Sequence, residues 1–377
     1  MDRGAGAERI RTLALAEGFD AAGVAALGPA ATGGAFRRWL ARGDHAGMAW
    51  LERRVERRLD PRRLLAGARS ALCVAWRYAP TAQEAGLSGD LWPRVARYAR
   101  GEDYHGLMLG RLERVGEAVG REFPGTTSLA YVDTGPLLER ELALRAGLGA
   151  VGKNTNLLSP ELGSWFLIGE LLLTLDLEPS LPLADLCGQC TRCLEACPTG
   201  ALPAPFRLDA NRCISYWTIE HRGPIPAERR AGLGEWAFGC DVCQEVCPWN
   251  GRPLPLAGRA AVEVPPARLD LDLSALLGLG DAEIRTRLAG SPLLRAKPEG
   301  LRRNAALALG NRGDRAAVPA LARALAADPS PVVRGAAAWA LGRLGGPAAR
   351  RALERARARE AEPAVRAELD PAPPSGA

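Results

Sequence analysis

Apolar residues recur with two different periods along the N-terminal part of this chain. Three segments place them three or four positions apart, as an amphipathic helix does: residues 7–17, 106–122 and 136–146. Three short apolar runs instead have the length of strands: residues 21–26, 70–78 and 129–132. Helical and strand-like segments that alternate along a chain predict an α/β domain, here over residues 1–180. The pattern does not give the order of the strands.

An internal repeat occupies the last part of the chain. The run Pro331-Val-Val-Arg334 returns as Pro363-Ala-Val-Arg366, and residues 304–310 match residues 336–342 at the same offset. Helical segments rich in Ala and Leu, with proline at the start and glycine at the end, are typical of an α-solenoid of the HEAT type. We therefore expect a HEAT-like helical repeat domain over residues 256–377.

The stretch between these regions, residues 181–255, contains eight of the nine cysteines. The first run is Cys187, Cys190, Cys193 and Cys197, and Pro198 follows it. This is the spacing C-x2-C-x2-C-x3-C-P of bacterial two-cluster ferredoxins, in which the fourth cysteine binds the other cluster. The spacing therefore predicts a ferredoxin-like domain with two [4Fe-4S] clusters.

The second cysteine run is incomplete. It holds Cys240, Cys243 and Cys247, and Ala237 stands where its first cysteine would be, so we expect Cys213 to supply the missing ligand. The resulting assignment gives each cluster four thiolates. One cluster is expected to be held by Cys187, Cys190, Cys193 and Cys247, and the other by Cys197, Cys213, Cys240 and Cys243.

Other uses of these cysteines fit the spacing less well. Zinc takes four ligands per ion, and three thiolates so close together along the chain suit that geometry poorly. A disulfide framework is typical of small secreted domains, whereas this chain has 377 residues and confines these cysteines to one stretch. The ninth cysteine, Cys73, lies in an apolar run and is expected to be a buried core residue.

Composition places the chain among globular proteins. Hydrophobic residues make up 47% of it, and the length suggests two or three domains. The longest apolar stretch, residues 165–177, is interrupted by Glu170 and Asp176 and is too short to span a bilayer. No export leader is evident, and thiolate ligands must stay reduced, so we expect a cytoplasmic protein without a membrane segment.

Positive charge is concentrated in the repeat region. Residues 285–366 hold 17 Lys and Arg against 6 Asp and Glu, although the whole chain carries only +6. A basic solenoid favours a polyanionic partner, and arginines that recur at equivalent positions indicate phosphate contacts. The expected contact residues are Arg302, Arg303 and Arg334. Solvated helix faces, or a scaffold that docks another protein, would explain the same pattern.

Further motifs occur in a fixed order along the chain. They are Arg97-Tyr-Ala-Arg-Gly-Glu-Asp-Tyr-His105, Tyr131-Val-Asp-Thr-Gly-Pro136, Gly149-Ala-Val-Gly-Lys-Asn154, Gly163-Ser-Trp-Phe-Leu-Ile-Gly-Glu170, Ile214-Ser-Tyr-Trp-Thr-Ile-Glu220 and Gly223-Pro-Ile-Pro226. Together with both cysteine runs and the HEAT-like units, this series resembles the epoxyqueuosine reductases, cobalamin-dependent iron–sulfur enzymes of queuosine biosynthesis in tRNA. The likeness covers nearly the whole chain.

This resemblance implies a reaction, its cofactors and its partners. The reaction is the two-electron reduction of epoxyqueuosine to queuosine at the wobble position of tRNA. The resemblance implies cobalamin in the N-terminal domain, with electrons arriving singly from the two clusters. Neither His45 nor His105 lies in the pattern Asp-x-His-x-x-Gly that places an imidazole on cobalt, so we expect base-off cobalamin with no protein histidine on the metal. The partners are the anticodon stem-loop of queuosine-type tRNAs and an external electron donor, and we expect a monomer.

The resemblance also assigns the catalytic residue. Asp133 would be the proton donor, which requires a carboxylic acid kept neutral near pH 7. Its position after Tyr131-Val132 places it at the end of a strand, where catalytic groups gather in α/β sheets, although a helix cap ahead of Pro136 is an alternative. Cofactor contacts are expected from Arg97, Tyr98, Lys153, Asn154, Ser164 and Ser215, with Tyr104 beside the same pocket. Core packing and surface turns are the alternatives for these residues.

Two other functions stay open from the residues alone. A reductive dehalogenase acting on an organohalide would use the same cofactors, but such proteins usually carry an export leader and lack a basic solenoid. A two-cluster electron-transfer protein with a docking repeat would need neither the large N-terminal α/β domain nor Asp133.

Overall fold

The computed structural model describes residues 2–78, 89–251 and 270–370. The chain packs as two compact units whose segments alternate along the sequence. The first comprises Met1–Thr81, Asp103–Asn211 and Asp241–Glu263, and the second comprises Ala82–Glu102, Arg212–Cys240 and Val264–Ala377. The expected boundary between residues 255 and 256 falls outside the described residues, and the division into three domains stays a prediction.

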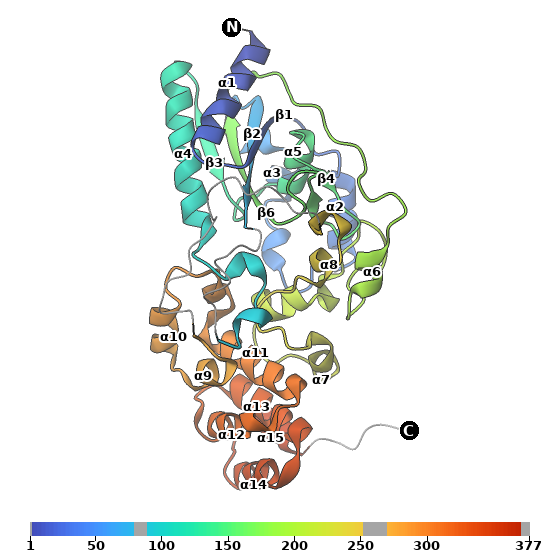
Figure 1. Ribbon diagram of the computed structural model, residues 1–377, viewed down its shortest axis with the longest axis vertical. Coiled ribbons are helices and arrows are strands. Elements are labelled where there is room, and N and C mark those ends of the chain that lie inside the picture. The colour runs from blue at the N-terminus through green and yellow to red at the C-terminus, as the bar shows by residue number, and fades with distance from the viewer. Residues whose placement is uncertain (1, 79–88, 252–269, 371–377) are drawn as a thin grey trace. The chain divides into compact units, whose positions relative to one another are not determined.

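The first unit is built on a four-stranded sheet of order β1-β2-β6-β3, in which every neighbouring pair is antiparallel (Figure 1). The strands are β1 Ala21–Ala26, β2 Ser70–Arg77, β3 Ser128–Tyr131 and β6 Phe166–Leu173. The three predicted strands are confirmed to within one residue, while no strand was predicted at β6. β2 is buried along its whole length because it lies between two strands and both faces of the sheet are covered.

Helices cover both faces of this sheet. On one face α1 Arg3–Ala16 and α4 Tyr104–Glu122 pack together, and α4 presses Met108 and Leu112 against Gly169 of β6. On the other face α5 Glu139–Arg145 packs on β1, β2 and β6. The prediction of a domain that mixes helices and strands is confirmed. Its remaining regular elements are α2 Gly33–Ala41, α3 Val55–Leu59, β4 Ala150–Val151, β5 Leu157–Leu158, α6 Arg192–Ala196 and α8 Val242–Glu245.

The second unit consists of helices, most of them in a repeat. Its α-helices are α7 Ala227–Arg230, α9 Leu273–Gly278, α10 Asp281–Arg287, α11 Lys297–Arg312, α12 Val318–Ala327, α13 Pro331–Leu344, α14 Gly346–Arg357 and α15 Pro363–Leu369. α13 packs between α11 and α15, so equivalent helices of successive repeats form one layer. Gly310 of α11 is needed there, because a Cβ atom at that position would lie 2.9 Å from the Cα atom of Ala340.

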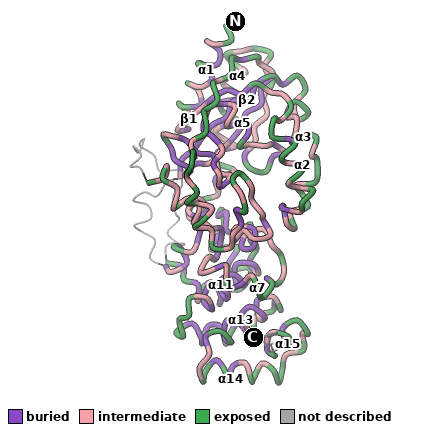
Figure 2. The backbone as a smooth tube through the Cα atoms, turned by 90° about the vertical axis from the view of Figure 1, so that its right-hand side faces the viewer, coloured by how far each residue is buried: buried purple, intermediate pink, exposed green. Residues whose placement is uncertain are grey.

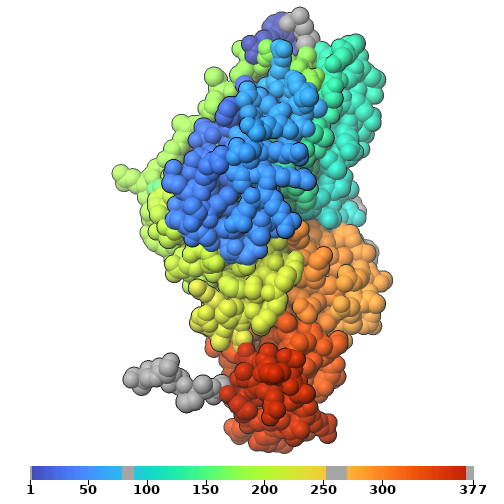
Figure 3. All heavy atoms as spheres, turned by 180° about the vertical axis from the view of Figure 1, so that it is seen from behind, coloured from blue at the N-terminus to red at the C-terminus, as the bar shows by residue number. Residues whose placement is uncertain are grey.

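Burial follows the layers of the repeat. α11 and α13 are largely buried, whereas α14 buries only Ala349 and Ala352 and exposes its arginines (Figure 2). In the space-filling view these last helices, drawn in red, are contiguous (Figure 3). The helical repeat predicted from the recurring motifs is therefore confirmed, with one layer in the interior and α14 at the surface. None of the described helices is long and apolar enough to cross a lipid bilayer.

Candidate functional site

Four cysteines of the first unit line one cavity of about 240 Å³. Cys187 and Cys190 precede α6, Cys193 lies in the first turn of α6, and Cys247 follows α8, which packs against α6. These are the four residues expected to hold one cluster. The structure thus brings together, from two separate cysteine runs, the set that the spacing predicted.

The chemistry of this cavity suits an iron–sulfur cluster. Burial raises the pKa of the Cys193 and Cys247 thiols, and the neighbouring cysteine Cys187 raises both further. Four thiolates in such a space therefore need the positive charge of bound metal, and an all-sulfur donor set selects iron–sulfur clusters or zinc. The backbone N–H of Lys153 lies 3.4 Å from Cys187 Sγ, a contact of the kind that tunes cluster potentials.

Three of the expected cobalamin contacts lie instead around the cysteine-bearing segments. Lys153 Nζ donates to the Gly188 carbonyl at 2.6 Å, and Asn154 Nδ2 donates to the Cys243 carbonyl at 3.2 Å. Ser164 Oγ donates to Gln244 Oε1 at 2.8 Å, one residue from Cys243. Asn154 and Ser164 are buried in these contacts. These contacts hold the cysteine loops in place, and the corrin contacts expected from the three residues stay predictions.

The other expected cofactor residues belong to the second unit. Arg97 and Tyr98 begin a 3-10 helix, Arg97–Ala99, and the Tyr98 ring lies 6.3 Å from that of Phe238. Ser215 is half-buried and precedes a π-helical turn, Tyr216–Glu220. Their cofactor contacts stay predictions.

The ligands expected for the other cluster are divided between the units. Cys197 and Cys243 belong to the first unit, and Cys213 and Cys240 belong to the second. The Cys213 carbonyl accepts a hydrogen bond from Trp217 N at 3.2 Å, which ties that cysteine to the π-helical turn. The grouping of these four residues stays a prediction.

Asp133 occupies a strained turn directly after β3. Its φ is +56°, in the left-handed region that Asp and Asn tolerate better than most residues. The turn folds back so closely that a Cβ atom on Gly135 would lie 2.5 Å from the Tyr131 ring. α5 begins only at Glu139, with Leu138 at its N-cap, so Asp133 does not cap this helix. The alternative explanation of Asp133 as a helix cap is therefore wrong.

The neighbours of Asp133 orient its carboxylate. Its Oδ2 atom accepts a hydrogen bond from Tyr104 Oη at 3.2 Å and lies 3.1 Å from His105 Nε2. The other ring nitrogen, Nδ1, lies 2.6 Å from Asp103 Oδ1, and Asp103 also caps α4. Burial opposes the charged ring, but the hydrogen bonds to Asp103 and Asp133 outweigh it and raise the pKa of His105 to about 9.

This arrangement has a chemical consequence. At neutral pH His105 is an imidazolium, and its two ring N–H groups donate to the carboxyl oxygens of Asp103 and Asp133. The Asp133 side chain is nevertheless 59% exposed, so it can meet a bound molecule. The site is thus a carboxyl group on a fixed turn, bordered by two donors. Asp133 was expected at a strand end where catalytic groups gather in α/β sheets. That rule applies to parallel sheets and does not explain the position of Asp133, because the strand pairs of this sheet are antiparallel.

Two of the arginines expected to bind phosphate are buried. Arg302 is 2% exposed and pairs with Asp281 at 2.7 Å and Asp328 at 2.8 Å. Arg303 is also 2% exposed and donates to three backbone carbonyls, those of Trp217, His221 and Gly223. Their guanidinium groups hold the repeat together and are not available to a phosphate.

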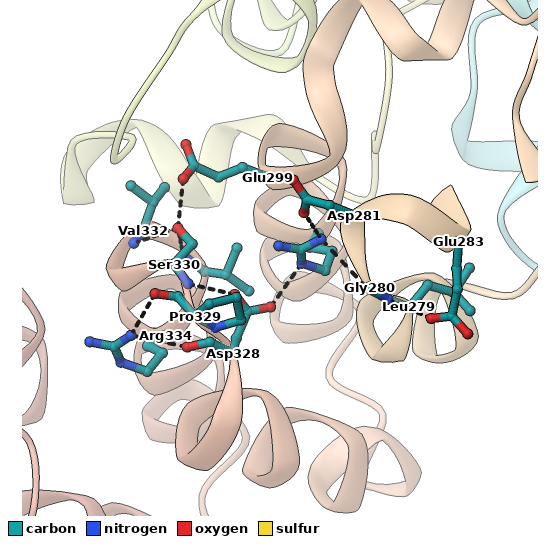
Figure 4. A network of polar contacts seen from close by, with 12 residues as sticks. Leu279, Gly280, Asp281, Glu283, Glu299, Asp328, Pro329, Ser330, Val332 and Arg334 are labelled. Carbon is teal, nitrogen blue, oxygen red and sulfur yellow. Dashed lines mark hydrogen bonds and ion pairs between the residues drawn. The ribbon is translucent and has the colours of Figure 1, made fainter. Parts of the chain in front are cut away.

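The third, Arg334, is engaged in the same way. It pairs with Glu360 at 2.8 Å. It also donates to the Asp328 and Pro329 carbonyls (Figure 4). Arg334 lies one repeat after Arg302, and the two arginines make equivalent contacts. Each pairs with an acidic residue 26 positions later in the sequence. The repeated arginine is therefore explained by internal ion pairs, which corrects the phosphate contacts expected for Arg302, Arg303 and Arg334.

Two carboxyl groups near Asp133 were missed by the sequence analysis. Glu139 opens α5, and Glu170 lies in the middle of β6 with no exposed surface. The one available signal was Glu170 itself, the acid that interrupts the apolar stretch of residues 165–177. Asn156, whose Nδ2 atom lies 3.9 Å from Cys243 Sγ, was also missed.

Comparison with known protein families shows which class of protein this chain belongs to. The chain matches the model of the 4Fe-4S double cluster binding domain over residues 186–250 and that of HEAT repeats over residues 291–369. It is therefore a protein of the double-cluster iron–sulfur class with a helical repeat. A third model, described as epoxyqueuosine reductase QueG, DUF1730, matches residues 58–134.

Curated relatives extend the match to most of the chain. An epoxyqueuosine reductase of Synechococcus sp. (strain CC9605) is 42% identical over 307 residues, which is 80% of this chain and 94% of the relative. One of Xanthomonas campestris pv. campestris is 42% identical over 81% of this chain and 86% of the relative. This chain belongs to the epoxyqueuosine reductase family.

Solved structures agree with this assignment. An epoxyqueuosine reductase from Bacillus subtilis, described with an aspartate on a catalytic loop swung out of the active site, superposes with a TM-score of 0.85 at 31% identity over 96% of both chains. An epoxyqueuosine reductase with an epoxyqueuosine-modified tRNA-Tyr stem loop gives 0.85 at 32% identity, again over 96% of both chains. A reductive dehalogenase is only 19% identical, with a TM-score of 0.44.

Proposed function

We propose that this chain reduces epoxyqueuosine in tRNA to queuosine, with electrons supplied through two [4Fe-4S] clusters. Relatives of this name cover most of the chain, and one solved relative holds an epoxyqueuosine-modified tRNA stem loop. The observation that carries the proposal is the site itself. A four-thiol cavity and an exposed carboxyl group, held by Tyr104 and His105 on a fixed turn, belong to one compact unit.

The four-thiol cavity supplies the electron path. Cys187, Cys190, Cys193 and Cys247 would hold one cluster, and the remaining four cysteines of the two runs would hold the other. Cobalamin is the cofactor implied by the resemblance, and when bound it would supply the cobalt centre that passes electrons to the substrate carbon. The residues of this chain fix the clusters, bind the tRNA and deliver protons.

Asp133 would act as the acid that protonates the epoxide oxygen. Support comes from its exposure, from its fixed backbone and from the catalytic-loop aspartate described for the Bacillus subtilis relative. A general acid must reach the atom that it protonates. Asp133 lies on a short loop directly after a strand, so the position of its side chain is well defined. The carboxyl group needs a proton at the moment of reaction, which makes its neighbours important.

The tRNA would be held by exposed cations of the repeat. Arg351 and Arg355 are both exposed and stand one turn apart on α14. Within the part of the chain that the structure describes, neither side chain forms an ion pair or a hydrogen bond. Two like charges at this spacing repel each other, and a phosphate between them would remove that penalty. They replace the buried arginines as the expected phosphate contacts.

Conversion of epoxyqueuosine-containing tRNA by the anaerobically purified protein tests the proposal. The cluster-loaded protein is supplied with cobalamin and a low-potential one-electron reductant, and the nucleosides are analysed by mass. The matched variant is Asp133→Asn, because Asn tolerates the left-handed backbone at this position while lacking a transferable acidic proton. Queuosine from the wild type and a rate lower by about 100-fold or more in the variant are expected.

Two results would overturn the proposal. Equal rates in the wild type and in Asp133→Asn would remove Asp133 as the acid. Absence of queuosine, in a protein that holds both clusters and receives electrons, would remove the reaction. Turnover of an organohalide would indicate a dehalogenase, and electron transfer without cobalamin binding would indicate a carrier.

A further inference from the structure

The proposed reaction takes up two protons, and this inference rests on that proposed function. Conversion of an epoxide to an alkene breaks both C–O bonds, forms one C–C π bond and releases the oxygen as water. The balance is epoxide plus two electrons plus two protons giving alkene plus water. Both protons end on the same oxygen atom. A single carboxyl group that faces this oxygen cannot supply both unless a neighbour reloads it.

His105 is the neighbour that the structure places in contact with Asp133. Its Nε2 atom lies 3.1 Å from Asp133 Oδ2, and its Nδ1 atom lies 2.6 Å from Asp103 Oδ1. The Tyr104 ring stacks on the imidazole with 4.1 Å between the ring centroids. His105 therefore bridges two carboxyl groups, one at the N-cap of α4 and one on the turn after β3.

The charge on this ring depends on both carboxyl groups. His105 lies in the first turn of α4, where the partial positive charge of the helix end disfavours a cation. Burial also disfavours the charged ring, but the hydrogen bonds to Asp103 and Asp133 outweigh these effects and raise the pKa of His105 to about 9. In this ion pair the proton is on Nε2 and Asp133 is a carboxylate. Asp133 by itself then holds no proton to give.

Two further titratable groups lie around the same turn. Glu139 begins α5, and Glu170 lies in β6 with no exposed surface. Burial raises the pKa of Glu139 to about 8 and that of Glu170 well above its usual range, so both are neutral at pH 7. The charges that act on the His105 ring at this pH are therefore those of Asp103 and Asp133, which its two nitrogens contact.

We propose that His105 supplies the protons of the reaction and that Asp133 passes them to the epoxide oxygen. The Asp133 side chain is 59% exposed, and a bound nucleoside that covers it removes its water. A carboxylate without water binds a proton more tightly, so the proton moves from the ring to Asp133. The neutral ring keeps its Nδ1–H and the hydrogen bond to Asp103.

The steps balance with the electrons of the proposed function. The Nε2–H bond of His105 breaks as an O–H bond forms on Asp133, and Asp133 then gives this proton to the epoxide oxygen. The His105 side chain is 32% exposed, so the ring takes its next proton from water. The second proton follows the same route, the clusters supply two electrons, and the oxygen leaves as water. His105 acts only through Asp133.

Tyr104 is the rival source, because its Oη atom lies 3.2 Å from the same atom, Asp133 Oδ2. Tyr104 is only 6% exposed, so loss of its proton would leave a buried phenolate beside a carboxyl group. Loss of a proton from His105 instead removes a charge and leaves a neutral ring. The geometry therefore favours His105 as the proton source, with Tyr104 as a donor that orients Asp133.

The first test is the pH dependence of queuosine formation in a single turnover, with the clusters and cobalamin loaded and reduced beforehand. The wild-type rate should fall as the pH rises through about 9, because His105 then loses its proton. His105→Gln should be slower by about 100-fold at pH 7 and should lack this fall. Asp103→Asn keeps a good cap on α4 but removes the charge beside Nδ1, so the fall should move to lower pH by about one unit or more.

The second test follows the ring itself and needs no turnover. The chain has three histidines, so NMR of protein with ¹⁵N-labelled histidine resolves each ring, and His105→Gln identifies the His105 signal. In the protein alone this ring should titrate near pH 9, and at a lower pH in Asp103→Asn. At pH 7, addition of an epoxyqueuosine-containing tRNA stem loop to protein with oxidised clusters should convert the ring to the neutral form with its proton on Nδ1.

His45→Gln is the matched control. His45 belongs to the same unit, and its Nε2 atom lies 3.1 Å from Glu52 Oε1, so it is a second histidine beside a carboxyl group. This variant should keep the wild-type rate and pH profile. Cluster content and melting temperature are recorded for every variant, so that a loss of folding is recognised.

Four outcomes would overturn the proposal. They are an unchanged pH profile in His105→Gln, a fall that does not move in Asp103→Asn, loss of the fall in Tyr104→Phe or Glu139→Gln instead, and a ring that stays charged in the stem-loop complex. Failure of the wild type to bind the stem loop or to form any queuosine, with a ring that titrates near pH 9, would instead refute the proposed function.

Discussion

Arg302 offers a direct test of the distinction between a buried structural cation and a phosphate contact. It is 2% exposed, and its Nε atom lies 2.8 Å from Asp328 Oδ2, whose side chain is 6% exposed. Its other partner, Asp281, is 54% exposed at the side chain. Substitution of Arg302 by Met keeps the length of the side chain and removes the charge. Asp328 is then left buried without its cation.

The magnitude follows from the burial of each partner. Removing one member of a buried ion pair lowers the free energy of unfolding by about 3–5 kcal/mol, and the exposed partner Asp281 adds only about 0–1 kcal/mol. For a unit of this size, each kcal/mol lowers the melting temperature by about 2–4 °C. Arg302→Met should therefore melt roughly 6 °C or more below the wild type, because the charge of Asp328 stays buried.

Thermal melting of the cluster-loaded protein is the assay. Arg351→Met, at an exposed position of α14, is the control and should melt like the wild type. Arg302→Met combined with Asp328→Asn should recover much of the loss, since the uncompensated charge is gone. A wild-type melting temperature for Arg302→Met, together with weaker tRNA binding, would refute this reasoning and restore Arg302 as a phosphate contact.

Three further outcomes are expected. Reversal of Arg351 and Arg355 to Glu should weaken tRNA binding and flatten its salt dependence in a titration of affinity, and an unchanged slope would count against α14 as the contact. The fold raises the pKa of His105, so the stabilisation by its charged ring is complete below about pH 6.5 and is lost as the pH rises through about 9. His105→Gln should therefore remove this part of the pH dependence of the free energy of unfolding. A pH profile like that of the wild type would contradict the expectation. Cys193→Ala should lose the iron of one cluster, about half of the total, while Cys73→Ala keeps all of it in an iron assay.

The cysteine ligands could be predicted from the sequence because cluster ligation depends on spacing. Short intervals fix which thiolates can wrap one cluster, and the proline and the x3 step direct the fourth one elsewhere. The cavity lined by Cys187, Cys190, Cys193 and Cys247 agrees with this local logic. The repeat was predictable for a related reason, since a helix pair that recurs at a regular interval must stack on its neighbour.

The roles of individual arginines could not be predicted in this way. Arg302 and Arg334 recur at equivalent positions, which a phosphate-binding surface and an internal ion pair explain equally well. The choice depends on Asp328 and Glu360, which lie well beyond their arginines in the sequence. Only the packing of the helices decides whether these acids face inward. The contacts of Lys153 and Asn154 could not be predicted either, because their partners lie on cysteine loops that are distant in the sequence.

The sequence by itself determined the class of the protein and the helical repeat, and it predicted the ligands of the clusters, because local spacing and periodicity control these features. The tertiary structure alone decided which charges are buried and which carboxyl groups lie around the Asp133 turn. Glu170, Glu139 and Asp133 come from a strand, a helix and a turn, and strand register with helix packing brings them together. Protonation depends on burial and on neighbouring charge, and both are properties of the folded chain.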